Sequence, residues 1–93
     1  AYFGLCDSER RLRRYDAALV ACRKAISYDP EEALAYYALG LTYAHQANAT
    51  GSRQRAAASA RALRTMLALN PDLKESNYAR QTLANIEQAL HKP

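Results

Sequence analysis

The 93-residue sequence has few of the residues on which catalytic and metal sites most often depend. It contains two His, two Cys and three Gly, and it has no Gly-rich phosphate-binding loop. Zinc takes about four ligands at suitable spacing, whereas His45 and His91 are far apart in the sequence and lack companions. No nucleophile stands in a pattern with a base and a residue that orients the base. We therefore expect no metal site, no cofactor, no catalytic residue and no enzymatic activity.

β-Branched residues are also scarce, with one Val, two Ile and four Thr, which argues against a sheet. Ala and Leu, both strong helix formers, occur twenty and twelve times. The composition predicts an all-α protein, and the length allows one domain with one modest core.

The sequence has no long hydrophobic run. The longest stretch without Asp, Glu, Lys or Arg covers residues 33–52, and only residues 33–44 of this stretch are strongly apolar. A membrane span needs about 20 apolar residues, so this segment predicts a buried helix and no membrane span. The sequence does not begin with Met, and we expect it to be a piece of a longer protein.

Basic residues exceed acidic ones, but the net charge of +4 is ordinary for a soluble domain. The densest charge run holds four Arg within residues 10–14. The helix dipole favours cations at a helix C-terminus, so a solvated helix end explains this run. A basic surface for nucleic acid or another anionic partner is an alternative, although a dedicated nucleic-acid binder usually shows a denser stripe. Arg53 and Arg55 open a predicted helix, where a partner anion or a neighbouring acid could compensate them.

The two cysteines, Cys6 and Cys22, are the only ones in the sequence. A single pair in a helical chain is weak evidence of a disulfide framework. We expect two small, buried and reduced thiols, with a redox pair as the alternative. Reduced thiols mildly favour a reducing compartment such as the cytoplasm, and the sequence gives no other indication of location.

Two dipeptides, Asp29-Pro30 and Asn70-Pro71, each follow an apolar helical run. The residue before Pro is pushed out of the helical region, so a helix ends at each dipeptide. The Asp or Asn can then cap the next helix or the turn that leads into it. Residues 13–16 and 47–52 are typical of turns. These signals predict five helices, at residues 1–13, 15–28, 31–47, 52–69 and about 75–91.

The sequence also repeats itself. A shift that places Cys6 on Gly40 aligns the Tyr and Leu that precede each of them. A longer shift, which places Cys22 on Leu63, aligns the two prolines that follow. The two shifts differ by about two helical turns, so an insertion of this length extends a helix and leaves its buried face in phase.

In this register the sequence resembles a tetratricopeptide repeat array, whose helix-turn-helix units have about 34 residues. The resemblance implies a right-handed stack of antiparallel helix hairpins: one repeat at 1–30, a second at 31–71 with the seven-residue insertion, and a capping helix at 72–93. The residues that carry the resemblance are Tyr2, Leu5, Cys6, Tyr15, Ala18, Cys22, Ala25 and Pro30, then Tyr36, Leu39, Gly40, Tyr43, Ser59, Leu63, Met66 and Pro71.

The resemblance also implies a non-catalytic module for protein–protein interaction, which binds a partner segment in a concave groove. The predicted helix at 31–47 carries a second apolar stripe besides the one that the family uses for its core. This second stripe predicts a partner groove, a surface for self-association, or internal burial, and these alternatives stay open. The candidate groove residues are Phe3, Asp7, Arg10, Arg11, Leu34, Tyr37, Ala38, Leu41 and His45.

One subclass of the family grips a C-terminal carboxylate with Lys and Asn. In this sequence Phe3, Asp7, Tyr37 and Leu41 stand at those groove positions, so the resemblance implies that this chemistry is absent. An apolar or aromatic-anchored protein segment is the expected ligand, with a homodimer as an alternative partner.

Overall fold

The computed structural model describes residues 2–92, apart from the side chain of Tyr2, and every regular element in this range is a helix. The side chain of Tyr2, one of the residues that carry the repeat pattern, therefore lies outside the described part. The five helices are α1 (Tyr2–Arg11), α2 (Tyr15–Tyr28), α3 (Ala33–Thr50), α4 (Arg53–Leu69) and α5 (Ser76–Leu90).

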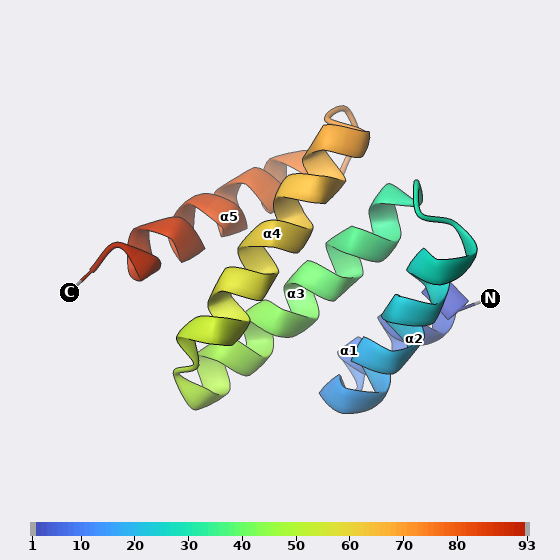
Figure 1. Cartoon of the computed structure of the whole chain (residues 1–93), viewed down its shortest axis with the longest axis horizontal. Coiled ribbons are helices and arrows are strands. Elements are labelled where there is room, and N and C mark those ends of the chain that lie inside the picture. The colour runs from blue at the N-terminus through green and yellow to red at the C-terminus, as the bar shows by residue number, and fades with distance from the viewer. Residues whose placement is uncertain (1, 93) are drawn as a thin grey trace.

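The helices form a stack of antiparallel hairpins, α1 with α2 and α3 with α4, followed by α5 against α4 (Figure 1). The helix α3 is central, since α1, α2 and α4 all contact it. In Figure 1 α1 lies behind α2, so the two helices of the first hairpin lie at different depths in this view. The predicted all-α hairpin stack is confirmed.

The third helix begins later and ends later than predicted. The side chain of Asp29 accepts a hydrogen bond from the amide of Glu31 (3.1 Å), which holds the segment before α3 in a turn. Glu31 and Glu32 therefore precede the helix, whereas the sequence predicted that they would lie in its first turn. At the other end the helix continues until Gly51, which adopts the left-handed conformation (φ 71°) that glycine tolerates, and Ser52 caps α4.

The first helix ends earlier than predicted, at Arg11. The amide of Arg14 donates to the carbonyl of Glu9 (2.8 Å) and that of Arg13 to the carbonyl of Arg10 (3.0 Å), the two bonds of a Schellman ending. This ending places Arg13 in the left-handed region (φ 62°), which costs a residue with a side chain about 1–2 kcal/mol.

The helices α3 and α4 approach each other most closely at Gly40. A Cβ atom at this position would lie 2.7 Å from Cδ2 of Leu63. The hydroxyl of Ser59 donates to the carbonyl oxygen of Gly40 (2.6 Å), and all three residues are buried. The leucine side chain thus fills the space that the missing Cβ leaves.

A disulfide joins Cys6 of α1 to Cys22 of α2, which corrects the expectation of two reduced thiols. Both residues are fully buried, as predicted. Their Cα atoms are 5.0 Å apart, within the range of about 4.4–6.8 Å that a disulfide can bridge. The two sulfur atoms meet because the cysteines lie at facing positions of the hairpin formed by α1 and α2. The disulfide also removes the basis on which a reducing compartment was favoured.

The last helix covers the second hairpin with one apolar side. Ala79, Leu83 and Ile86 pack in a cluster with Leu63 and Met66 of α4. This helix therefore covers core residues of the second hairpin, as expected of a capping helix.

We predict that Gly40→Ala lowers the free energy of unfolding by about 1–3 kcal/mol, because the added methyl group collides with Leu63. The matched control is Gly4→Ala in α1, where an added Cβ meets nothing within 4 Å. That change should stabilise the chain by about 0.5–1 kcal/mol through helix propensity. Urea denaturation measures both values, and equal effects at the two positions would contradict the close approach.

We predict that reduction of the disulfide lowers the free energy of unfolding by about 3 kcal/mol, because the unfolded chain regains the freedom of the loop between Cys6 and Cys22. Urea denaturation with and without a reductant measures the loss. The variant with both cysteines changed to Ala should show a comparable loss and no response to the reductant. Thiol labelling of the unreduced, unfolded chain would show that the bond is absent.

Candidate partner-binding face

The predicted groove residues occupy the surface formed by α1, α3 and α5, which we call the groove face. Phe3, Asp7, Arg10, Leu34 and Tyr37 are half-buried there. Two of the remaining residues, Arg11 and His45, are exposed, whereas Ala38 and Leu41 are buried at 1% and 7% exposure.

The second apolar stripe of α3 is in part internal. Ala38 packs with Cys6, Ala21 and Cys22, so it lies beneath the groove face and contacts the first hairpin. A helix that is apolar on all sides is expected to be buried on most of them. The central position of α3 among three other helices supplies that burial and accounts for Ala38.

Tyr37 stands between the first and the last helix on the groove face. Burial raises the pKa of its phenol, opposed by the positive charge of Arg10 on α1 and assisted by Tyr78 and Glu75 at the start of α5 and by Asp7 on α1. Groups from both sides therefore act on one hydroxyl. A half-buried tyrosine with its polar end at the surface suits a wet binding site.

An open pocket of about 460 Å³ lies where α3 ends, α4 begins and α5 passes over them. Leu41 and Ala44 of α3 and Ile86 and Leu90 of α5 give it an apolar lining. Its polar residues are His45, Asn48, Ser52, Arg53, Tyr78, Thr82 and Asn85. A pocket of this size with a few polar groups falls in the range of about 300–1,000 Å³ that is typical of ligand sites. We call it the apolar pocket.

The arginines at the end of α1 differ in their partners. Asp7 accepts a hydrogen bond from Nη2 of Arg10 (2.6 Å) and forms an ion pair with Arg11, whose Nε lies 3.0 Å from Oδ2. Arg14 lies 3.7 Å from the carboxylate of Glu9. Arg13 has no ion-pair partner within the part of the chain that the structure describes. The run is therefore a helix end with two acids, as the dipole suggests, but one of its four charges stays uncompensated.

A second, more polar pocket of about 430 Å³ lies beside this helix end. We call it the arginine pocket, and it is lined by Arg10, Arg11, Arg13, Tyr15, His45, Asn48 and Ala49. The rings of His45 and Tyr15 stack in it, with their centroids 5.8 Å apart. Partial burial, together with the charges of Arg10 and Arg13, lowers the pKa of His45 below its ordinary value of 6.5.

The residues that the sequence analysis missed are those of the far wall of the apolar pocket. Arg53 donates a hydrogen bond to the carbonyl oxygen of Leu90, so the end of α5 compensates this arginine instead of the anion or acid that we considered. Tyr78 is 57% exposed and lines the pocket. The sequence shows Tyr78 only as a tyrosine near the start of the last helix, which does not by itself indicate a pocket.

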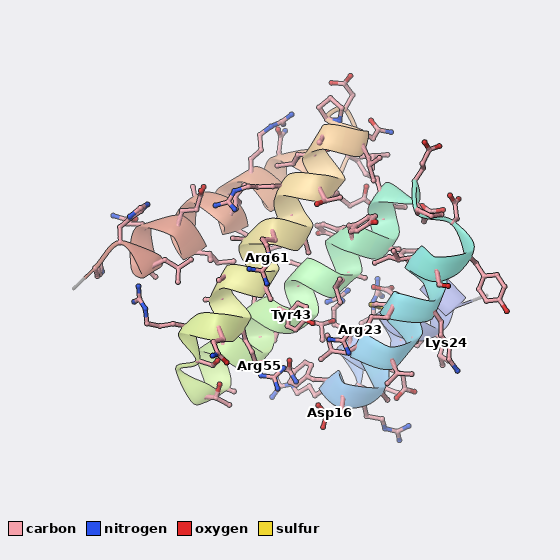
Figure 2. All side chains as sticks on the ribbon, viewed as in Figure 1. Asp16, Arg23, Lys24, Tyr43, Arg55 and Arg61 are labelled. Carbon is pink, nitrogen blue, oxygen red and sulfur yellow. A yellow bond between two sulfur atoms is a disulfide. The ribbon has the colours of Figure 1, made fainter. Side chains whose placement is uncertain are left out.

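The face turned toward the viewer in Figure 2, where α2 lies in front of α1, carries polar contacts between helices. Arg23 donates to the hydroxyl of Tyr43 (2.5 Å), and the figure shows these two side chains directed toward each other across α2 and α3. Arg55 donates to the amide oxygen of Gln46 (2.6 Å). These two cations therefore contact neighbouring helices, which accounts for them without an external anion.

Two kinds of site are absent from the described residues. Between residues 2 and 92, no three His, Cys, Asp or Glu residues are grouped so that they could hold a metal ion. In the same range, no helix has both the length and the apolar character that crossing a bilayer requires.

The fold and the groove face together define a protein of the helical-repeat class. Residues 7–46, from within α1 to within α3, match the family model described as TPR repeat. The match covers somewhat less than half of the chain, and it supports the assignment of the chain to the tetratricopeptide repeat family that the sequence indicated. No curated protein and no solved structure matches the chain. Tetratricopeptide repeats generally mediate protein–protein interactions and are typically non-catalytic.

We predict that His45 titrates below pH 6.5 in the folded chain and that Arg13→Asn raises its pKa, because one of the nearby positive charges is removed. Asn tolerates the left-handed conformation of this position. Since the pKa is lower in the folded than in the unfolded chain, this group favours folding above pH 6.5, and that contribution is lost as the pH falls below 6.5.

The measurement is an NMR titration of the His45 ring, assigned with the variant His45→Gln. The control variant Arg14→Gln removes a charge that acts on Glu9 and lies outside the arginine pocket. A larger rise of the pKa in this control than in Arg13→Asn would contradict the placement of Arg13 beside His45.

Proposed function

We propose that the chain is a non-catalytic interaction module that binds an extended segment of a partner protein across its groove face. The observation that carries the proposal is the open pocket of about 460 Å³, which is lined by Leu41 of α3 and Tyr78 of α5. The half-buried Tyr37 precedes Leu41 by about one turn of α3. The match to a family whose repeats generally mediate protein–protein interactions supports it.

The chemistry of this face fits an apolar or aromatic anchor. Leu41, Ala44, Ile86 and Leu90 offer apolar contact, and Tyr78 adds a large exposed ring at the rim. Aromatic anchors seated in such recesses supply much of the binding energy of many interfaces. Phe3 and Leu34 are further half-buried apolar contacts on the same face.

We predict that Tyr78→Ala weakens binding of a partner segment by about 1–4 kcal/mol and leaves the melting temperature nearly unchanged, because this side chain is mostly exposed. The segments come from a displayed library of random peptides that is selected on the unaltered chain. Their affinities are then measured by fluorescence anisotropy, and melts are followed by circular dichroism.

The matched control is Tyr28→Ala at the end of α2, which removes the same side chain from a position outside both pockets of the groove face. Equal losses in the two variants, or a library from which nothing is enriched, would reject the proposed function. Analytical ultracentrifugation decides the alternative of self-association: a dimer that Tyr78→Ala converts to monomer would assign the face to a second copy of the chain.

A further inference from the structure

The two pockets of the groove face adjoin each other across the C-terminal part of α3. His45 and Asn48 line both of them. The apolar pocket extends from these residues toward α5, and the arginine pocket extends from them toward the end of α1. A partner segment that crosses α3 at His45 therefore meets two recesses of different chemistry in succession.

The arginine pocket has an excess of positive charge. None of the residues that line it is acidic, and Asp7, which pairs with two of its arginines, is shared by Arg10 and Arg11. Asp16 lies in the adjoining recess, which Arg13 also lines. Arg13 has no ion-pair partner among the described residues. The Nε atom of Arg10 is buried without a hydrogen-bond partner. The recess thus offers the charge of Arg13 to an acceptor that bears negative charge.

The apolar pocket has a complementary character. Leu41 and Ile86 line it with large side chains, and Ala44, Ala56 and Ala89 leave room for a side chain from outside. The lining of the pocket contains no acidic residue, so it does not attract a basic side chain of a partner segment.

We propose that the groove face recognises a protein segment with an acidic side chain and an apolar side chain about three residues apart, the carboxylate in the arginine pocket and the apolar group in the apolar pocket. The spacing follows from a helix width of about 10 Å and a rise of about 3.3 Å per residue in an extended chain. This inference rests on the proposed function and names the class of segment that the same face takes.

A nucleic acid fits these observations less well than an acidic peptide. A phosphate backbone is usually bound by a row of cations along one face. Here Arg23 and Arg55 are engaged with Tyr43 and Gln46, and the recess beside the arginine pocket is apolar. One carboxylate and one apolar group match this alternation better than a run of phosphates.

The test is a selection of random displayed heptapeptides on the unaltered chain and on three variants. Arg13→Asn removes the uncompensated charge. Ala89→Phe fills the apolar pocket from an exposed position, and Gln88→Phe, next to it and outside the pocket lining, is its control. We expect Asp or Glu about three positions from a large apolar residue in the peptides that the unaltered chain enriches. The acidic preference should disappear in Arg13→Asn, and the apolar preference should disappear in Ala89→Phe alone.

A double-mutant cycle measures the proposed contact directly. A selected peptide is synthesised with its Asp or Glu and with the matching Asn or Gln, and both are bound to the unaltered chain and to Arg13→Asn by fluorescence anisotropy. Each single change should weaken binding about threefold to fivefold, because Arg13 is exposed, and the second change should add little to the first. Arg14→Gln, which removes a charge outside the arginine pocket, should leave the acidic preference in place.

The failures of the two proposals are distinguishable. Enriched peptides that need Tyr78 but show no acidic preference, or an acidic preference that survives Arg13→Asn, would overturn this inference and leave the proposed function intact. A library without any peptide that depends on Tyr78 would overturn both. A fluorescent single-stranded oligonucleotide is the third probe: if it binds in an Arg13-dependent way with a steep loss in salt, and the acidic peptides do not bind, the inference is overturned and the recess serves phosphates instead.

Discussion

The close approach of two helices at one point in each hairpin sets the geometry on which the rest of the structure depends. In the second hairpin this point is Gly40, whose missing side chain admits Leu63. The repeat register places Cys6 and Cys22 at the same two positions of the first hairpin, and there a disulfide joins the helices. A glycine and a leucine in one hairpin, and two bonded cysteines in the other, are two solutions to the same requirement of little space between the helix axes.

The short distance between the two helices of each hairpin also determines how the helices of the groove face are arranged. The first helices of the two hairpins, α1 and α3, contact each other, and α5 packs on α4. Burial raises the pKa of Tyr37, on which charged and polar groups of α1 and of the start of α5 also act. The helices α3 and α4 are longer than α1 and α2. Asn48, Gly51 and Arg53, where α3 ends and α4 begins, form a wall of the apolar pocket.

The repeat pattern was enough to predict the number of helices and their pairing, because both depend on local signals. The bond between Cys6 and Cys22 was missed, since separation along the sequence does not give the distance between two sulfur atoms. The partner of Arg53 could not be predicted either. It is a backbone carbonyl of Leu90, 37 residues away, and its position depends on how far α5 diverges from α3. The apolar pocket depends on the angles between α3, α4 and α5, which the residue types in the sequence do not give.

The charge at the end of α1 illustrates why location matters more than the total of +4. Asp7 offsets part of the charge of Arg10 and Arg11, whereas Arg13 has no ion-pair partner among the described residues. An exposed ion pair contributes about 0–1 kcal/mol, whereas full burial of one large apolar side chain contributes about 1.5–3 kcal/mol. In the proposed binding mode the apolar pocket therefore supplies most of the affinity of this face. The arginine pocket selects which segments bind and in which direction, because only a segment with a carboxylate at the right place pairs with Arg13.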